Sequence, residues 1–212
     1  MGRDRSDAKT TGASPTRGRL VEAARALVEA GGPDAMSMRK VAAEVGVAAT
    51  AIYWHVGSRE ELLHEVLDVI IGELPELRAR GSTPRRRVAS LARGMRDQAL
   101  ATTHTQQLAR QLGRSAELFL PGQVAIAREL AAAGLHGEAA AEAVRSLIFL
   151  VGGFVLLEDN YRVAGTGTAQ DLWAGVSDPA LDPELIAAMS RRTTPDDLFD
   201  YTLDRLLESV VP

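Results

Sequence analysis

Apolar residues recur with the period of an α-helix along most of the chain. After Thr16, the residues Leu20, Ala24, Leu27 and Val28 share one face of a 3.6-residue helix. No segment shows sustained alternation of apolar and polar residues, the period-two pattern of a half-buried strand. The pattern therefore predicts an all-α protein of about nine or ten helices.

Two short helices follow the first one. Ser37 is a candidate N-cap for a helix of about two turns, which Gly46 should end. Another short helix is expected over residues 48–55, so only a glycine turn separates the two. Short helices joined in this way form the helix-turn-helix pattern.

A longer helix is expected to leave this unit. Ser58 and Glu61 have the spacing of a capping box, which predicts a linking helix over residues 58–74, and Pro75 should end or kink it. The chain then divides into a polar arm that we expect to be disordered (1–15), a helix-turn-helix unit with its linking helix (16–74) and a larger helical part (75–212). Further helices are predicted at about 84–101, 104–113, 115–134, 138–162, 183–190 and 195–209, with one long loop over 163–183.

Charge is distributed unevenly between these parts. The net charge is −4, but residues 1–60 carry +2 and the remainder carries −6. Only the first part is therefore suited to a phosphate backbone. The N-terminus has no apolar signal-peptide core, and the longest apolar run, 147–157, is shorter than a membrane span. We expect a cytoplasmic protein without a membrane partner.

Catalytic and metal-binding signatures are missing from the sequence. It contains no cysteine, which excludes disulfides and thiolate metal sites. It also lacks a nucleophile elbow, a zinc-protease helix motif and a phosphate-binding Walker loop. The four histidines, His55, His64, His104 and His136, do not have the spacing of a metal site. We expect no enzyme activity, no metal and no cofactor.

Two segments carry a family resemblance. RLVEAARALVEAGG (19–32) and SMRKVAAEVGVAATAIYWHVGSREELL (37–63) resemble, in order, the DNA-binding domain of the TetR/AcrR family of transcriptional regulators. This resemblance implies an amino-terminal DNA-binding domain fused to a domain that dimerises and senses a small molecule. It further implies DNA contacts at the positions Ser37, Arg39, Thr50, Tyr53, His55 and Arg59.

The residues themselves fit that role. A recognition helix needs small residues where its backbone approaches the major groove, as at Ala48, Ala49 and Thr50. An aromatic hydroxyl and an imidazole at the helix end can reach phosphate or a thymine methyl. The N–H groups of the helix that Ser58 opens can also bind phosphate. The candidate DNA-binding residues are Ser37, Arg39, Ala48, Ala49, Thr50, Tyr53, Trp54, His55, Ser58 and Arg59.

Several of these residues have a simpler alternative. For Trp54 we favour partial burial against the first and fourth helices over base contact, whereas for Tyr53 we favour DNA contact. His55 could instead cap the short helix, and Arg59 could pair with Glu60 or Glu22. Arg39 could be a solvated surface charge.

The carboxy-terminal part has a resemblance of its own. VRSLIFLVGGFVLLED (144–159) and FDYTLDRLLESVV (199–211) are similar to the corresponding domain of the tetracycline-repressor-like branch, which implies a homodimer formed by two helices of each copy. Each glycine inside a helix costs about 1 kcal/mol relative to alanine, and close packing should offset that cost. A dimer interface, a tight crossing within the chain and a bound ligand are the three explanations. The interface candidates are Gly152, Gly153, Phe199, Leu203, Leu206 and Leu207, with core burial as the alternative for the apolar ones.

The same resemblance places an effector pocket among the helices at 84–113, 115–134 and 138–162. Its apolar candidates could equally be core residues, His104 a surface histidine, and Glu158 a partner of Arg162 at i+4. The candidates are Met95, His104, Gln107, Leu108, Gln111, Phe119, Phe149, Phe154, Glu158 and Trp173. We predict a repressor that binds a palindromic DNA operator as a homodimer and is released by a small apolar or aromatic effector. The alternative is a DNA-binding regulator without a ligand.

Overall fold

The computed structural model describes residues 16–211 apart from 165–171, and their side chains apart from 159–164. The predicted arm, residues 1–15, lies outside this range. The described residues form ten α-helices and one short 3-10 helix and contain no strand, which confirms the all-α prediction. The bounds of the predicted helices agree with the observed ones to within two residues.

The amino-terminal domain (residues 16–74) is built from α1 (Arg17–Gly31), the 3-10 helix η1 (Pro33–Ala35), α2 (Met38–Val45), α3 (Ala49–Val56) and α4 (Arg59–Gly72). α1 packs against α2, α3 and α4. Leu20, Val41, Ile52, Leu62 and Val66 are completely buried between these helices. The apolar positions that predicted α1 and α2 therefore form one continuous core.

Local capping defines the helix-turn-helix. The Ser37 hydroxyl oxygen accepts a hydrogen bond from the Lys40 backbone N–H at 3.3 Å and begins α2. Gly46 ends α2 with φ +76°, a left-handed conformation that suits glycine because a Cβ would be strained there. Ser58 and Glu61 form the predicted capping box at the start of α4.

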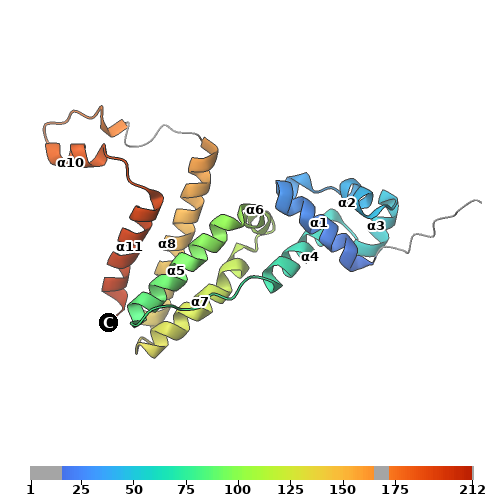
Figure 1. Ribbon diagram of the computed structural model, residues 1–212, viewed down its shortest axis with the longest axis horizontal. Helices are drawn as coiled ribbons and strands as arrows, with labels where there is room; N and C mark the ends of the chain where they lie inside the picture. Colours follow the sequence, from blue (N-terminus) through green and yellow to red (C-terminus); the bar gives the residue numbers. More distant parts are fainter. Residues whose placement is uncertain (1–15, 165–171, 212) are drawn as a thin grey trace, which may run out of the picture.

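The carboxy-terminal domain (residues 75–211) contains α5 (Pro84–Ala101), α6 (Thr103–Gln111), α7 (Ser115–Ala132), α8 (Gly137–Ala164), α10 (Pro183–Met189) and α11 (Pro195–Val210). α5 packs against α7, α8 and α11, and α8 packs against α7 and α11. In Figure 1 the amino-terminal domain lies at one end of the molecule, and α8 and α11 lie at the other. α4 therefore carries the link between the two domains.

The packing of the two domains overlaps. Leu108, Ala109 and Leu118 belong by sequence to the carboxy-terminal part, yet they join the apolar core of the amino-terminal domain. α6 packs against both α1 and α4. The described chain therefore has two apolar cores, and the predicted boundary after residue 74 does not separate them, because α6 and the start of α7 belong to the first core. Because α6 packs against α4, a displacement of α6 is transmitted directly to α4.

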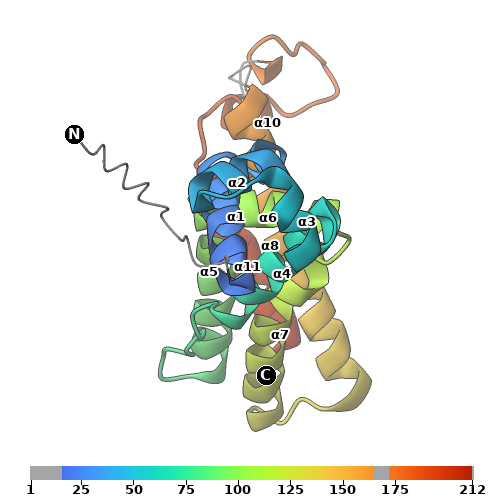
Figure 2. The ribbon, with the colours of Figure 1, turned by 90° about the vertical axis from the view of Figure 1, so that its right-hand side faces the viewer.

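α8 has one buried and one exposed apolar face. Ala143, Leu147, Val151 and Val155 are buried against the neighbouring helices, whereas Phe149 is 82% exposed. By length and composition alone, 137–158 would be apolar enough to cross a membrane, contrary to our expectation from the shorter run 147–157. Only 22% of this segment is buried within the subunit. α10, by contrast, lies away from the helix bundle in both views (Figures 1 and 2) and has no buried residue.

Candidate nucleic-acid interface and effector cavity

α3 presents two large aromatic side chains to the surface. Ile52 is completely buried and Val56 nearly so, and these two residues hold the helix against the rest of the domain. Tyr53 is 54% exposed and Trp54 is 90% exposed. Burying an aromatic side chain of this size would stabilise the protein by roughly 1.5–3 kcal/mol, so two exposed neighbours indicate a contact surface.

Our expectation that Trp54 is partly buried is wrong. Trp54 lies two positions from both Ile52 and Val56, which corresponds to about 200° of helical rotation. The face that points into the core therefore points away from the indole. The exposure of Trp54 could have been predicted from the sequence, because Ile52 and Val56 are four positions apart and so share the buried face of α3.

The small residues stand at the start of α3 as predicted. Ala48 is the N-cap and offers no side-chain hydrogen bond to the first turn. Ala48 and Thr50 are exposed, and Ala49 is half-buried. His55 is half-buried at the carboxyl end of the helix, in its last turn. α3 therefore offers a narrow amino-terminal edge followed by an aromatic surface.

On α2 the candidates divide between capping and exposed charge. Ser37 is half-buried and caps the helix, which gives its hydroxyl a structural role. Arg39 and Lys40 are both exposed, and the Lys40 ammonium donates a hydrogen bond to the Ala35 carbonyl oxygen at 2.7 Å. These two cations lie on α2, which packs against α3.

At the start of α4, two candidates already have partners within the chain. The Ser58 N–H donates to the Glu61 carboxylate at 2.6 Å, and the Glu61 N–H donates to the Ser58 hydroxyl at 3.1 Å. The backbone hydrogen bond from Ser58 is the main reason that the pKa of Glu61 is lowered. The capping box therefore occupies the backbone N–H groups of Ser58 and Glu61, and phosphate binding by the other N–H groups of the first turn stays a prediction.

Arg59 is the second of these candidates. Its guanidinium donates to the carbonyl oxygens of Pro33, at 2.6 Å, and Met36, at 3.2 Å. It pairs with neither Glu60 nor Glu22, the alternatives that its sequence neighbourhood suggested. Arg59 therefore ties the segment before α2 to α4, and its predicted DNA contact stays a prediction.

A small cavity lies between α5, α6 and α7. Its volume is about 10 Å³, which is about the space that one water molecule needs. Met95 and Phe119, two of the predicted pocket residues, line it. The prediction missed the other lining residues: Leu74, Gln98, Ala99, Thr102, Gln106 and Leu118.

Four of the lining residues share one face of α5. Met95, Gln98, Ala99 and Thr102 are spaced by three, one and three positions. This helical spacing is visible in the sequence, but the sequence did not indicate which face of α5 meets α7. Gln98, Thr102 and Gln106 give the cavity a polar side, and Leu74, Leu118 and Phe119 give it an apolar one.

Four other pocket candidates on α6 lie outside this cavity. The His104 Nδ1 is 2.8 Å from the Glu29 carbonyl oxygen, and Gln107 lies against Gly32, so both face the amino-terminal domain. Leu108 is a completely buried member of the amino-terminal core, and Gln111 is exposed. None of the four lines this cavity, but His104 lines a separate, open pocket of about 520 Å³ together with Glu29 and Thr103.

The candidates on α8 are also separated from the cavity. Phe149 points outward, and Phe154 packs edge to face on Phe199 with ring centroids 5.1 Å apart. Glu158 pairs with Arg96 at 2.8 Å, although the sequence suggested Arg162. Trp173 is half-buried in the segment beyond the end of α8.

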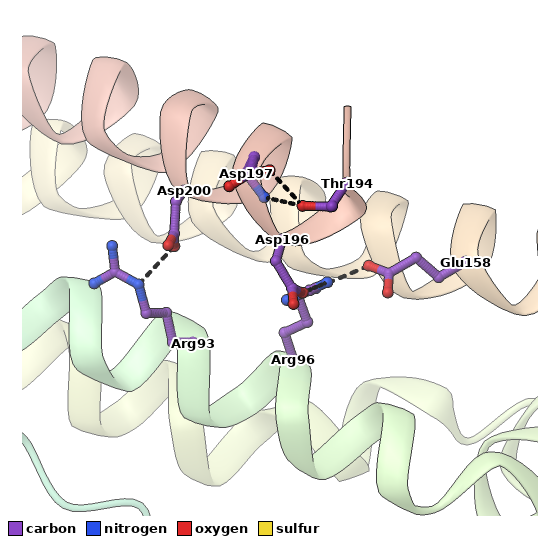
Figure 3. Close-up of polar contacts among 7 residues, drawn as sticks. All are labelled: Arg93, Arg96, Glu158, Thr194, Asp196, Asp197 and Asp200. Atoms are coloured by element: carbon purple, nitrogen blue, oxygen red, sulfur yellow. Dashed lines mark hydrogen bonds and ion pairs between the residues drawn. The ribbon is translucent and has the colours of Figure 1, made fainter. Parts of the chain in front are cut away.

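Arg96 joins three helices (Figure 3). Its guanidinium on α5 contacts Glu158 of α8 and, at 2.6 Å, Asp196 of α11, and it lies 4.8 Å from the centre of the Phe199 ring. Burial alone would lower the pKa of Arg96, but the hydrogen bonds to the two carboxylates raise it. Nearby, Arg93 pairs with Asp200 at 2.7 Å. This network fixes α8 and α11 to α5.

The predicted interface residues divide into two groups. Phe199, Leu203 and Leu207 are completely buried within the subunit and cannot form an interface, so core burial, the alternative, is correct for them. Leu206 is half-buried, as is Gly152, and Gly153 is exposed. A Cβ at either glycine would contact no described residue within 4 Å, so neither glycine is needed for a tight crossing between the described helices.

The exposed faces of α8 and α11 carry residues that the prediction missed. Phe149, Leu156 and Leu157 are at least 49% exposed on α8, and Leu198 and Tyr201 are at least 50% exposed on α11. We call these five residues, with Gly153, the α8–α11 surface. They follow the helical period of each element, so they form continuous stripes.

Known proteins resemble the chain both in part and in whole. The family model of bacterial regulatory proteins of the tetR family matches residues 20–66. An HTH-type transcriptional regulator of Saccharopolyspora erythraea is 37% identical over 59 residues, which is 28% of this chain and 25% of that protein. The HTH-type transcriptional repressor DrrR1 of Streptomyces coeruleorubidus is 41% identical over 66 residues, which is 27% of this chain and 24% of that protein. These matches span about a quarter of the curated relatives.

Solved structures match over nearly the whole chain. ActR of Streptomyces coelicolor in complex with actinorhodin is 25% identical, with a TM-score of 0.67 over 93% of this chain and 97% of that one. Apo ActR is 24% identical, with a TM-score of 0.65 over 93% of this chain and 95% of that one. Because the matches cover 93% of this chain, the shared fold includes carboxy-terminal helices. The helix-turn-helix region is therefore similar to that of bacterial regulatory proteins of the tetR family, and the whole chain shares the fold of ActR.

Proposed function

We propose that the protein is a transcriptional repressor that binds double-stranded DNA through α2 and α3. The observation that carries this proposal is the outward position of Tyr53 and Trp54 on a helix whose other face is fully packed. Small residues precede them, so the amino-terminal end of α3 can approach a groove closely. Arg39 and Lys40 on the neighbouring helix supply positive charge for phosphates.

The candidate DNA-binding residues divide into two groups. We retain Arg39, Ala48, Ala49, Thr50, Tyr53, Trp54 and His55 as contact residues. Ser37, Ser58 and Arg59 cap and brace the helices, because their polar groups bind the protein's own backbone or, for Ser58, also Glu61. Removing one of these three should weaken DNA binding through the position of α3.

The α8–α11 surface supports a homodimer. Five large apolar side chains and an exposed glycine lie on two helices that Arg96 fixes to α5. Isolated surface apolar residues are common, but continuous stripes on adjacent helices are typical of an association surface. Two copies related by a twofold axis place two α3 helices on a palindromic site, which one short helix is too small to specify.

We infer that a small apolar or aromatic effector binds in the cavity between α5, α6 and α7. Its apolar wall and the polar groups of Gln98, Thr102 and Gln106 suit a flat molecule with a few polar substituents. ActR, which shares the fold, has been solved with actinorhodin and with (S)-DNPA. The cavity must enlarge to take any such molecule, and Met95, a flexible side chain, is the residue that can move.

The size of the cavity also favours a second candidate function. A volume of about 10 Å³ is too small for any organic effector, as expected of a regulator that works without a ligand. The two candidates differ in a thermal-shift screen of apolar and aromatic compounds. An effector-controlled repressor gains stability with at least one compound, and that gain disappears when Met95 and Phe119 are both replaced by Trp to fill the cavity.

DNA binding is tested by selection from a random duplex library. The wild-type protein should enrich a palindromic sequence, and Tyr53→Ala with His55→Ala should abolish its gel shift while circular dichroism remains that of the wild type. Leu120→Ala, an exposed position on α7, is the matched control and should bind like the wild type. Unchanged affinity of the Tyr53 and His55 double variant would contradict the proposal.

A further inference from the structure

α4 is held by arginines on two sides. On one side, Arg17 pairs with Glu65 at 2.5 Å, and Arg25 pairs with Glu73 at 2.5 Å. Both arginines belong to α1, so these pairs lie within the amino-terminal domain. They bind α1 to α4, and α3 packs against both helices.

On the other side, α4 meets the turn between α6 and α7. The Arg114 guanidinium, at the start of α7, contacts the Asp68 carboxylate of α4 at 2.6 Å. Among the ion pairs between described residues, it alone joins residues 16–74 to the rest of the chain. A terminal nitrogen of Arg114 also lies 3.5 Å from both the carbonyl oxygen and Nδ1 of His64.

Arg114 is fixed by its own helix before it reaches α4. Glu117 binds the guanidinium in a bidentate manner, at 2.8 and 2.6 Å. The Arg114 backbone N–H donates to the Ala109 carbonyl oxygen at 2.8 Å, which closes the turn. The hydrogen bond from Arg114 also lowers the pKa of Glu117, so this carboxylate stays charged at neutral pH. The contacts with Glu117 therefore hold the planar guanidinium of Arg114 in an orientation that faces Asp68.

The apolar contacts at this junction do not define a register by themselves. Leu108, Ala109 and Leu118 belong to the same apolar cluster as the buried residues of α4, and apolar contacts are non-directional. The ion pair between Arg114 and Asp68, by contrast, is directional and forms in only one register of α4. We propose that Arg114 is a positioning residue that fixes the register of α4 against the α6–α7 turn and thereby the direction of α3 relative to the carboxy-terminal domain.

The same turn borders the effector cavity. Leu118 and Phe119, one helical turn after Arg114, line that cavity. A molecule that enlarges the cavity displaces the first turn of α7 and with it the Arg114–Asp68 pair. This last step rests on the proposed function, because it takes the cavity to be the effector site. The positioning role of Arg114 itself does not depend on it.

The experiment measures the orientation of the two domains directly. Because the wild-type chain has no cysteine, Glu44→Cys on α2 and Glu142→Cys on α8, both exposed, can carry two nitroxide labels. Pulsed electron resonance of labelled chains diluted in unlabelled protein gives the distance within one subunit. Asp68→Asn should widen the distance distribution roughly twofold, since α4 then samples neighbouring registers.

Glu73→Gln is the matched control. It removes a similarly exposed ion pair, but one inside the amino-terminal domain, so the distribution should keep its width. Arg114→Gln should widen the distribution as Asp68→Asn does, and Asp68→Glu, which retains the carboxylate, should restore it. Circular dichroism confirms that each variant is folded.

A distribution that stays narrow in both Asp68→Asn and Arg114→Gln overturns the inference, as does equal widening in Glu73→Gln. The measurement uses no DNA and no effector. A failure of the proposed function therefore appears separately, as the absence of an enriched sequence in the selection experiment.

Discussion

Substitutions at exposed and at buried residues of α3 should differ in their effect on the free energy of unfolding. Trp54 is 90% exposed and makes no contribution to the core, so Trp54→Ala should change the free energy of unfolding by less than about 0.5 kcal/mol. Ile52→Ala, two residues away, should cost about 2–5 kcal/mol, because it opens a cavity in a completely buried site. Urea denaturation followed by circular dichroism measures both values. A Trp54→Ala cost as large as that of Ile52→Ala would show that the indole packs in solution.

Glu61 should make α4 sensitive to acid. Its pKa is lowered in the folded protein by the hydrogen bonds of the capping box, so its contribution to stability is fully present above its unfolded pKa, about 4.3. The contribution is lost as the pH falls through the lower, folded pKa. Melting temperatures from pH 7 to 3 should therefore fall less steeply below about pH 5 in Glu61→Gln than in the wild type. Glu60→Gln, which makes neither capping bond, should follow the wild-type curve, and identical slopes in all three proteins would contradict the assignment.

The predictability of these residues depends on how far along the chain their partners lie. Ser58 and Glu61 are three positions apart, so the capping box is a local pattern and was predicted correctly. Arg59 binds carbonyl groups 23 and 26 positions away, and no local pattern encodes such a choice. The exposure of Trp54 is an intermediate case, because the phase of α3 determines it once Ile52 and Val56 are known to face inward.

At the scale of elements, α5 and α7 approach closely at one point. The Met95 thioether of α5 occupies the space that a side chain at Gly122 of α7 would need. Gly122→Leu should therefore destabilise the protein by about 1–3 kcal/mol, because the larger side chain forces Met95 and its neighbours to move. Urea denaturation measures the change.

Gly18 provides the control for this substitution. It lies in the first turn of α1, where a Cβ would meet nothing within 4 Å, so Gly18→Leu should leave the stability unchanged or raise it slightly. An equal loss in both variants would indicate a general effect of removing a helical glycine. A loss of stability in Gly122→Leu alone would show that the new side chain collides with Met95.

Helix bounds were predicted well, whereas helix faces were not. Helix caps and apolar periods are local patterns that span only a few residues. They therefore predicted the bounds of the ten α-helices of the described chain to within two residues. Phe149 and Phe154 lie on the same helix and are the same residue type, yet one is 82% exposed and the other packs on Phe199. That difference arises from α11, which lies about 45 residues further along the chain. The residues of the cavity are undetermined for the same reason, because contacts between distant helices create them.

At the scale of the whole molecule, the two proposed contact surfaces lie at opposite ends. α3 stands at one end, and the α8–α11 surface stands at the other (Figure 1). A dimer built on α8 and α11 therefore leaves both α3 helices accessible. A signal between the two surfaces can pass through the contacts that α6 makes with α1 and with α4.

Phe149 should be the most sensitive residue of the dimer. Its ring is 82% exposed in the subunit and lies on the same helix as Gly153, so a carboxylate in its place would be buried without a partner when two copies associate. Phe149→Asp should weaken dimerisation at least about 100-fold, a change of roughly 2.8 kcal/mol. Sedimentation velocity over a dilution series measures the dissociation constant.

Leu120→Asp is the control for that measurement. Leu120 is also exposed, at 55%, but lies on α7 outside the α8–α11 surface, so this variant should dimerise like the wild type. Both variants should retain the helical circular dichroism of the wild type, since neither side chain is buried in the subunit. A wild-type monomer at micromolar concentration, or a Phe149→Asp protein that associates as tightly as Leu120→Asp, would show that the copies do not meet through α8. The two α3 helices would then have to be brought together by another surface, because a single α3 contacts too few base pairs to select one operator.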